Sequence, residues 1–143
     1  MGITHHSNYV RWMEEARIDL LDQIGWGLEK IEKTGVAGPI VSIECRYKRP
    51  TTFPELITVY VTVEDVRGAK LILRYKMLNA EGQTVFEGRS ENCFTDSNGK
   101  VLRLDRNMPE LYNALLSLKD GVLTAAEGPD QAAGQAETSE DAE

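Results

Sequence analysis

The sequence predicts a single α+β domain in which one long helix packs against an antiparallel sheet. Three observations lead to this fold class. Apolar residues near the N-terminus recur with a helical period, the middle of the chain alternates between apolar and polar residues, and short turns separate the alternating stretches. Because antiparallel sheets usually bury one face, we expect the early helix to cover that face.

The first element is expected to be a helix from Ser7 to about Ile24. Its apolar residues recur at helical steps and form one stripe: Tyr9, Met13, Ala16, Leu20 and Ile24. Ser7 or Asn8 is suited to cap the start, because each side chain can accept a backbone hydrogen bond. Gly25 is suited to end the helix in the left-handed conformation. A shorter helical segment is expected from Leu28 to Lys33.

Alternating residues then predict at least four antiparallel strands, followed by a final helix. The strands are expected at Val36–Tyr47, Ile57–Glu64, Lys70–Met77 and Thr84–Thr95. Turn residues separate or follow them at Arg67-Gly68, Asn79–Gly82 and Asn98-Gly99. Pro109 is expected to open the final helix, which runs to about Leu118.

The composition divides the chain into a domain at residues 1–120 and an acidic tail at residues 121–143. The tail has no branched aliphatic or aromatic residue after Leu123, so we expect it to be disordered and its removal to leave folding unchanged. It carries six of the 23 acidic residues and no basic one, which leaves 17 acidic and 16 basic residues in the domain. A nearly neutral domain does not favour nucleic-acid binding.

Further features favour a cytoplasmic location. No apolar run approaches the roughly 20 residues of a membrane span, and no signal peptide is recognisable. Cys45 and Cys93 have neither a zinc-site nor a disulfide spacing, and reduced thiols are expected.

The residues that carry chemistry lie in the first seventeen positions, from Met1 to Arg17. Here a glycine-containing loop leads through His5 and His6 into the start of a helix. A helix start offers unpaired N–H groups and a partial positive charge. These features suit an anion, or a carbonyl oxygen that becomes negative during a reaction.

This stretch resembles the hotdog-fold acyl-CoA thioesterases of the 4-hydroxybenzoyl-CoA thioesterase-like group. The matching residues are Gly2, His6, Asn8, Tyr9, Glu15, Ala16 and Arg17. Residues 47–50 with Phe53-Pro54 are similar to the family's connection between its second and third strands. The resemblance covers about residues 1–119. It implies a hotdog fold, in which a curved antiparallel sheet wraps a central helix, and an active site where two subunits join their sheets edge to edge.

The resemblance also implies an activity, which is hydrolysis of acyl-CoA thioesters to the free acid and coenzyme A without a metal or organic cofactor. The backbone N–H of His6 would polarise the thioester carbonyl, and its side chain would hold a water or the acyl group. Gly2, His5 and Asn8 would help to bind the substrate, and Tyr9 would line the acyl pocket. Acyl carrier protein could replace coenzyme A, and a homodimer or homotetramer is expected. A structural alternative is that His6 only braces the helix cap.

One part of the family pattern would lie upstream of this sequence. The family's catalytic aspartate stands seven residues before the His6 position, which is two residues before Met1, and the family's first strand precedes it. Either the native protein is longer, or this is a short form that binds acyl-CoA or dimerises without hydrolysis. We favour a longer protein, because loss of a strand would expose core and a sheet edge.

Other chemical interpretations of the same stretch are weaker. Glu14 and Glu15 are the nearest carboxylates, but a solvated or salt-bridged helix face with Arg11 or Arg17 is the simpler expectation. The adjacent histidines have no further ligands to complete a metal site. A hotdog dehydratase would need a different placement of histidine and carboxylate.

Overall fold

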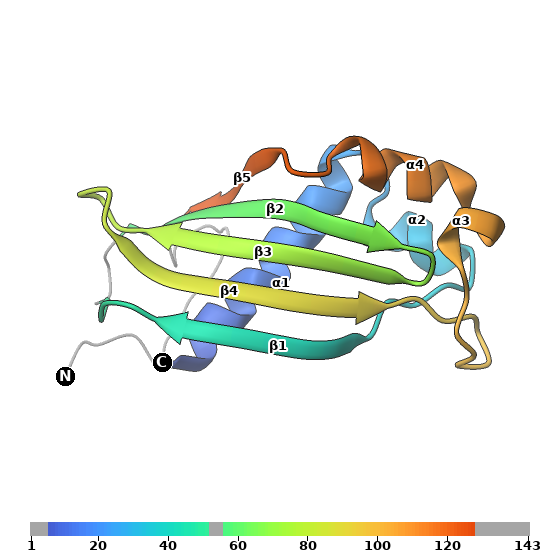
Figure 1. The fold of residues 1–143 in the computed structure, drawn as a ribbon, viewed down its shortest axis with the longest axis horizontal. Coiled ribbons are helices and arrows are strands. Elements are labelled where there is room, and N and C mark those ends of the chain that lie inside the picture. Colours follow the sequence, from blue (N-terminus) through green and yellow to red (C-terminus); the bar gives the residue numbers. More distant parts are fainter. Residues whose placement is uncertain (1–5, 52–55, 128–143) are drawn as a thin grey trace.

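The structure is a computed structural model that describes residues 6–51 and 56–127, with side chains described for residues 8–51 and 56–121. A twisted antiparallel sheet forms one layer, and the long helix α1 crosses its inner face diagonally (Figure 1). The elements are α1 His6–Gln23, α2 Leu28–Lys33, β1 Ile40–Tyr47, β2 Thr58–Arg67, β3 Lys70–Leu78, β4 Thr84–Cys93, α3 Leu104–Asn107, α4 Pro109–Ser117 and β5 Val122–Glu127. The predicted α+β hotdog architecture is confirmed.

Helix α1 places its apolar stripe against the sheet, as its sequence period predicts. The buried residues of this helix are Tyr9, Trp12, Met13, Ala16, Leu20 and Leu21. Gly25 follows the helix with φ +82°, and its N–H donates to the carbonyl of Asp22, so the predicted stop is confirmed. The expected cap is wrong, because the helix begins at His6 and both Ser7 and Asn8 lie within its first turn.

The sheet has five strands in the order β1-β4-β3-β2-β5. The four strands expected from the alternation are present. The first is shorter than expected and starts at Ile40, because residues 36–39 contribute only a single bridge between Ala37 and Thr95. On β2 the inward side chains of Val59, Val61 and Val63 are completely buried, as alternation requires.

The strand β5 corrects the expected domain boundary. Val122–Glu127 pairs antiparallel with β2, so the prediction that the domain ends at residue 120 and that the whole of 121–143 is a tail is wrong. A strand at an edge gains backbone hydrogen bonds that do not depend on apolar composition. The turn after α4 sets its start, where the Asp120 N–H donates to the Val63 carbonyl at 2.9 Å. Residues 128–143 lie outside the described part of the chain.

Close packing of α1 on the sheet depends on Gly88 in β4. A Cβ at this position would lie 2.8 Å from Cε2 of Phe86 and 3.1 Å from Sδ of Met13. Only a residue without a side chain therefore allows this approach without a shift of its neighbours. Met13 of α1 thereby packs directly over Gly88 of β4.

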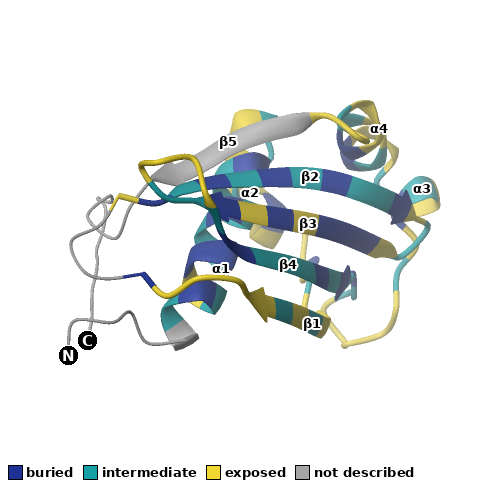
Figure 2. Cartoon of the chain, turned by 60° about the vertical axis from the view of Figure 1, so that its left-hand side comes forward, coloured by how far each residue is buried: buried dark blue, intermediate teal, exposed yellow. Residues whose placement is uncertain are grey.

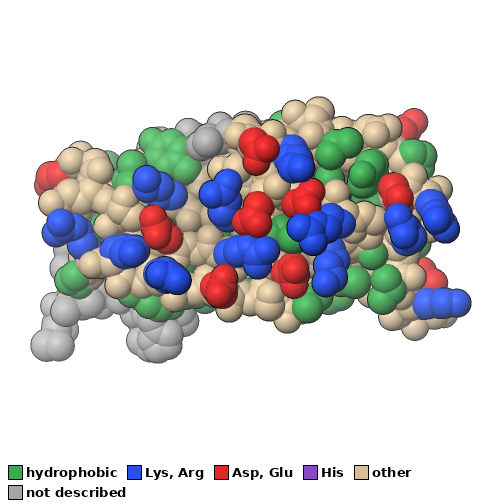
Figure 3. Space-filling view, in the orientation of Figure 1, with side chains coloured by type: hydrophobic (Ala, Val, Ile, Leu, Met, Phe, Trp, Pro, Cys, Tyr) green, Lys and Arg blue, Asp and Glu red, His purple; other side chains and the backbone are tan. Residues whose placement is uncertain are grey.

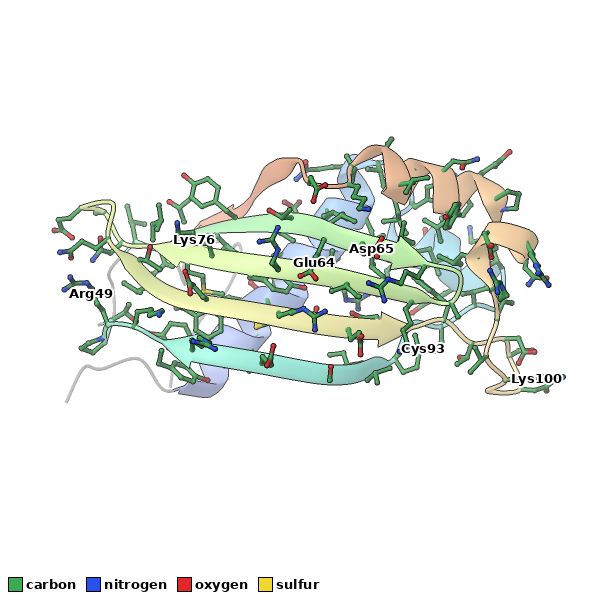
Figure 4. All side chains as sticks on the ribbon, in the orientation of Figure 1. Arg49, Glu64, Asp65, Lys76, Cys93 and Lys100 are labelled. Carbon is green, nitrogen blue, oxygen red and sulfur yellow. The ribbon has the colours of Figure 1, made fainter. Side chains whose placement is uncertain are left out.

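The outer face of the sheet is charged and has no helix over it (Figure 3). Glu64 of β2 lies at its centre and is shared by two arginines, with Nε of Arg89 at 3.2 Å and Nε of Arg74 at 3.4 Å (Figure 4). A hollow of about 630 Å³ lies on this face, lined by residues of β1, β2, β3 and β4.

Candidate functional site

The residues predicted to form the site lie at and before the start of α1. Gly2 and His5 fall outside the described residues. His6 is the first residue of α1, and its side chain is not among those described. Asn8 lies in the first turn, where its Oδ1 accepts a hydrogen bond from Nη2 of Arg11 at 2.7 Å. Of the residues predicted to form the site, the structure therefore describes the backbone of His6 and the complete residues Asn8 and Tyr9. All three lie in the first turn of α1.

Tyr9 anchors the start of α1 to the core. Its side chain is only 3% exposed, and its hydroxyl lies 2.6 Å from Oγ1 of Thr51, which is also buried. Its ring stacks on Phe86 with centroids 5.0 Å apart and planes 12° apart. The role of Tyr9 as a wall of the acyl pocket stays a prediction, and the structure adds a packing role that fixes the first turn.

Tyr47 is a residue of this region to which the sequence analysis gave no role. It is the last residue of β1, and its ring meets Tyr9 and Phe86 edge-on, with centroids 5.2 Å and 5.3 Å away. Its side chain remains 49% exposed. Partial burial, followed by the neighbouring Cys45 and Tyr9, raises the pKa of Tyr47 above its usual value. The alternation of β1 was the available signal, because it places Tyr47 on the same face as Ile43 and Cys45.

The two glutamates of α1 differ in their surroundings. Oε2 of Glu14 lies 2.6 Å from Nη2 of Arg17, so the salt-bridged helix face expected from the sequence is confirmed for Glu14. The side chain of Arg17 is 13% exposed, which makes this pair better shielded from water than a typical surface pair. Partial burial raises the pKa of Glu15, and the charge of Arg11 opposes that rise.

A buried polar contact lies further along the inner face, between β3 and β4. The hydroxyl of Tyr75 is 3.1 Å from Oγ of Ser90, and both residues are buried. Burial raises the pKa of Tyr75 to about 12, and the hydrogen bond to Ser90 opposes the shift. The shift in pKa extends the alkaline range over which Tyr75 stays neutral.

The hollow on the outer face does not belong to this region. Its lining includes Lys76, which lies on the face of the sheet turned away from α1 (Figure 4), whereas the first turn of α1 lies on the inner face. We therefore place the candidate site at the start of α1, on the side of the sheet where Tyr9 and Tyr47 meet.

Strand β1 forms the edge of the sheet next to this site. It pairs with β4 on one side, and no strand of the described residues pairs with its other side. Ile40 and Val41 are 46% and 54% exposed, and most of β1 is coloured as exposed in Figure 2. None of the helices in the described part of the chain is long and apolar enough to cross a membrane.

Comparison with known proteins agrees with this fold. The sequence pattern of the thioesterase-like superfamily matches residues 1–130, and the chain belongs to this family. YneP of Bacillus subtilis, provisionally named an acyl-CoA thioesterase, is 31% identical over 115 residues, which cover 80% of this chain and 83% of that protein.

Solved structures of thioesterases have the same fold as this chain. A DHNA-CoA thioesterase from Staphylococcus aureus superposes with a TM-score of 0.77 at 29% identity, covering 82% of this chain and 79% of the other. A 1,4-dihydroxy-2-naphthoyl-CoA thioesterase from Synechocystis shares the fold, with a TM-score of 0.74 at 18% identity over 82% and 85% of the two chains. The prediction of a hotdog-fold acyl-CoA thioesterase is confirmed.

Proposed function

We propose that this protein hydrolyses acyl-CoA thioesters at the start of α1. The observation that carries the proposal is the position of this helix start. In a hotdog fold of the thioesterase-like superfamily, the first turn of α1 is fixed by Tyr9 against the core. A helix start fixed in this way holds its unpaired N–H groups in a constant direction.

The chemistry follows from those N–H groups. The thioester carbonyl accepts a hydrogen bond from the backbone N–H of His6, and the partial positive charge of the helix start stabilises the oxygen as it becomes negative. Water adds to the carbonyl carbon, the C–S bond breaks, and coenzyme A leaves as its thiolate. By resemblance, a carboxylate acts as the base that takes a proton from this water. Gly2, His5 and Asn8 contribute to binding of the substrate.

The exposed edge of β1 supports a homodimer as the working form. An uncovered edge with exposed Ile40 and Val41 presents backbone groups and apolar surface to a second copy. A two-fold pairing of β1 with its own copy would extend the sheet and place the two α1 starts beside the junction. A homotetramer would then be a pair of such dimers.

The two cysteines support a location in the cytoplasm. Cys45 and Cys93 are both free thiols and only partly buried. A reducing compartment keeps such thiols from oxidising.

The test separates the backbone of His6 from its side chain. His6→Pro removes the N–H at the first helical position, where proline is well tolerated, and His6→Ala keeps it. With acyl-CoAs as substrates and free thiol as readout, we expect His6→Pro to lower kcat by about 10²–10³ relative to His6→Ala. Equal rates for the two variants would contradict the proposed role of this N–H.

The substrate panel includes aliphatic and aromatic acyl-CoAs and an acyl carrier protein thioester, because the Staphylococcus aureus relative is a DHNA-CoA thioesterase. The chain is compared with a version extended upstream through the expected strand and aspartate. Activity in the extended form supports hydrolysis. Binding of acyl-CoA without turnover in either form would favour a binding or dimerisation module instead.

A further inference from the structure

The inner face of β1 is less well covered by α1 than the rest of the sheet. Its inward residues are Ile43, Cys45 and Tyr47, which pair with Ser90, Gly88 and Phe86 of β4. Ile43 and Cys45 are partly buried and Tyr47 is 49% exposed, whereas the inward residues of β2 are completely buried. A strip of apolar and aromatic surface therefore borders the helix on this side.

Tyr47 is the aromatic residue of this strip, and the core holds it in place. Its ring plane lies at 80° to that of Tyr9 and at 68° to that of Phe86, so both contacts are edge-on. Tyr9 and Phe86 are themselves stacked and buried, 3% and 0% exposed. A ring fixed by two buried rings, with about half of its surface open, is a rigid contact surface.

The position of Tyr47 matches the position of the acyl group in the proposed reaction. Tyr9, which Tyr47 contacts, follows His6 by three residues, which corresponds to about 5 Å along the helix axis. A thioester carbonyl held by the His6 N–H would thus place its acyl group within reach of the Tyr47 ring. This step rests on the proposed function.

We propose that Tyr47 is a binding residue for the acyl group and that it selects planar aromatic acyl groups over flexible aliphatic ones. An aromatic ring that packs on Tyr47 extends the existing array of Tyr47, Tyr9 and Phe86, and aromatic pairs gain energy beyond the area they bury. A planar acyl group also loses less rotational freedom on binding than an alkyl chain does. The phenol is neutral at physiological pH, which suits this packing, and partial burial raises its pKa further from that range.

A binding experiment tests this selection without requiring turnover. The probes are two non-hydrolysable thioethers of coenzyme A, one carrying a phenacyl group and one a 2-oxoalkyl group of similar size. By calorimetry, we expect Tyr47→Leu to weaken binding of the phenacyl probe about tenfold and to leave the alkyl probe nearly unchanged. Tyr47→Phe retains the ring and should retain the preference.

Tyr60→Leu is the matched control, because Tyr60 is a partly buried tyrosine on the outer face of β2. It should leave the ratio of the two affinities unchanged. Equal weakening of both probes by Tyr47→Leu, with an unchanged melting temperature, would show a general packing role and overturn the proposal. Equal affinities of the unmodified protein for both probes would also overturn it.

The kinetic counterpart is the ratio of kcat/KM for benzoyl-CoA to that for hexanoyl-CoA. In Tyr47→Leu this ratio should fall about tenfold through the aromatic substrate alone. An absence of hydrolysis of either substrate would count against the proposed function, whereas the thioether affinities would still decide the role of Tyr47.

Discussion

The two edges of the sheet differ in how well the adjoining side chains are buried. At one edge, β5 pairs with β2 and lies beside inward residues such as Val61 and Val63, which are at most 1% exposed. At the other edge, β1 exposes Ile40 and Val41 and leaves Tyr47 half open (Figure 2). The chain therefore covers its core with a strand of its own at the β5 edge, whereas at the β1 edge apolar and aromatic surface stays exposed in the described part of the chain.

The largest effect is expected from removal of β5. Truncation after Asp120 exposes the β2 edge and apolar core beside it, and should lower the free energy of unfolding by roughly 3–5 kcal/mol. Truncation after Glu127 keeps the strand and is the matched control, with no expected change. Urea unfolding of both forms measures the difference. Equal stability of the two would mean that β5 does not contribute to the core.

The next effect concerns the inner face between the two edges, where Tyr75 of β3 is hydrogen-bonded to Ser90 of β4. The unfolded chain releases the Tyr75 proton near pH 10, and the folded chain releases it near pH 12. The folded state thus binds the proton more tightly, so this contribution is complete below pH 10 and is lost as the pH rises from 10 to 12. Over that range, the free energy of unfolding should fall by roughly 2–3 kcal/mol more than in Tyr75→Phe.

Urea titrations of both proteins at several alkaline pH values measure this difference. The comparison uses the slope of the free energy of unfolding against pH for each protein. Absolute values are not compared, because Tyr75→Phe also removes the contact with Ser90 and so changes the free energy of unfolding at every pH. Parallel slopes would contradict a raised pKa for Tyr75.

A smaller effect is expected at the β1 edge itself. Val41→Lys places a charge on the exposed edge, twice in a two-fold dimer, and should raise the dimer dissociation constant about tenfold or more. Val101→Lys is the matched control, since Val101 is a comparably exposed valine that lies outside β1. Light scattering across a dilution series measures both variants. A dimer that is indifferent to Val41→Lys would place its interface elsewhere.

The smallest effect is expected on the outer face, away from both edges. Glu64→Gln removes the carboxylate that Arg74 and Arg89 share. Because this group is partly exposed, the melting temperature should change by less than about 3 °C, and added salt should reduce the change further. A larger change that persists in high salt would show that this cluster is more than a surface ion pair.

The helices and strands in which apolar residues recur at regular intervals were predictable from the sequence. The stripe of α1 and the alternation of β2 and β3 each reflect a local rule, so their positions agree with the structure within a few residues. The four-residue helix α3 has no such period and was not predicted. β5 was missed because only Val122 and Leu123 of its residues are large and apolar, too few to show an alternation, and its pairing depends on the edge of β2.

The first seventeen residues identify the family, and local periods identify most elements, because both are encoded in residues close together along the chain. The contacts of the candidate site have another origin. Tyr9 meets Thr51 across 42 positions and meets Tyr47 and Phe86 from other strands. Such contacts arise only when strand register and the approach of α1 at Gly88 bring distant residues together. For this reason the contacts of Tyr47 with Tyr9 and Phe86 are visible only in the folded chain.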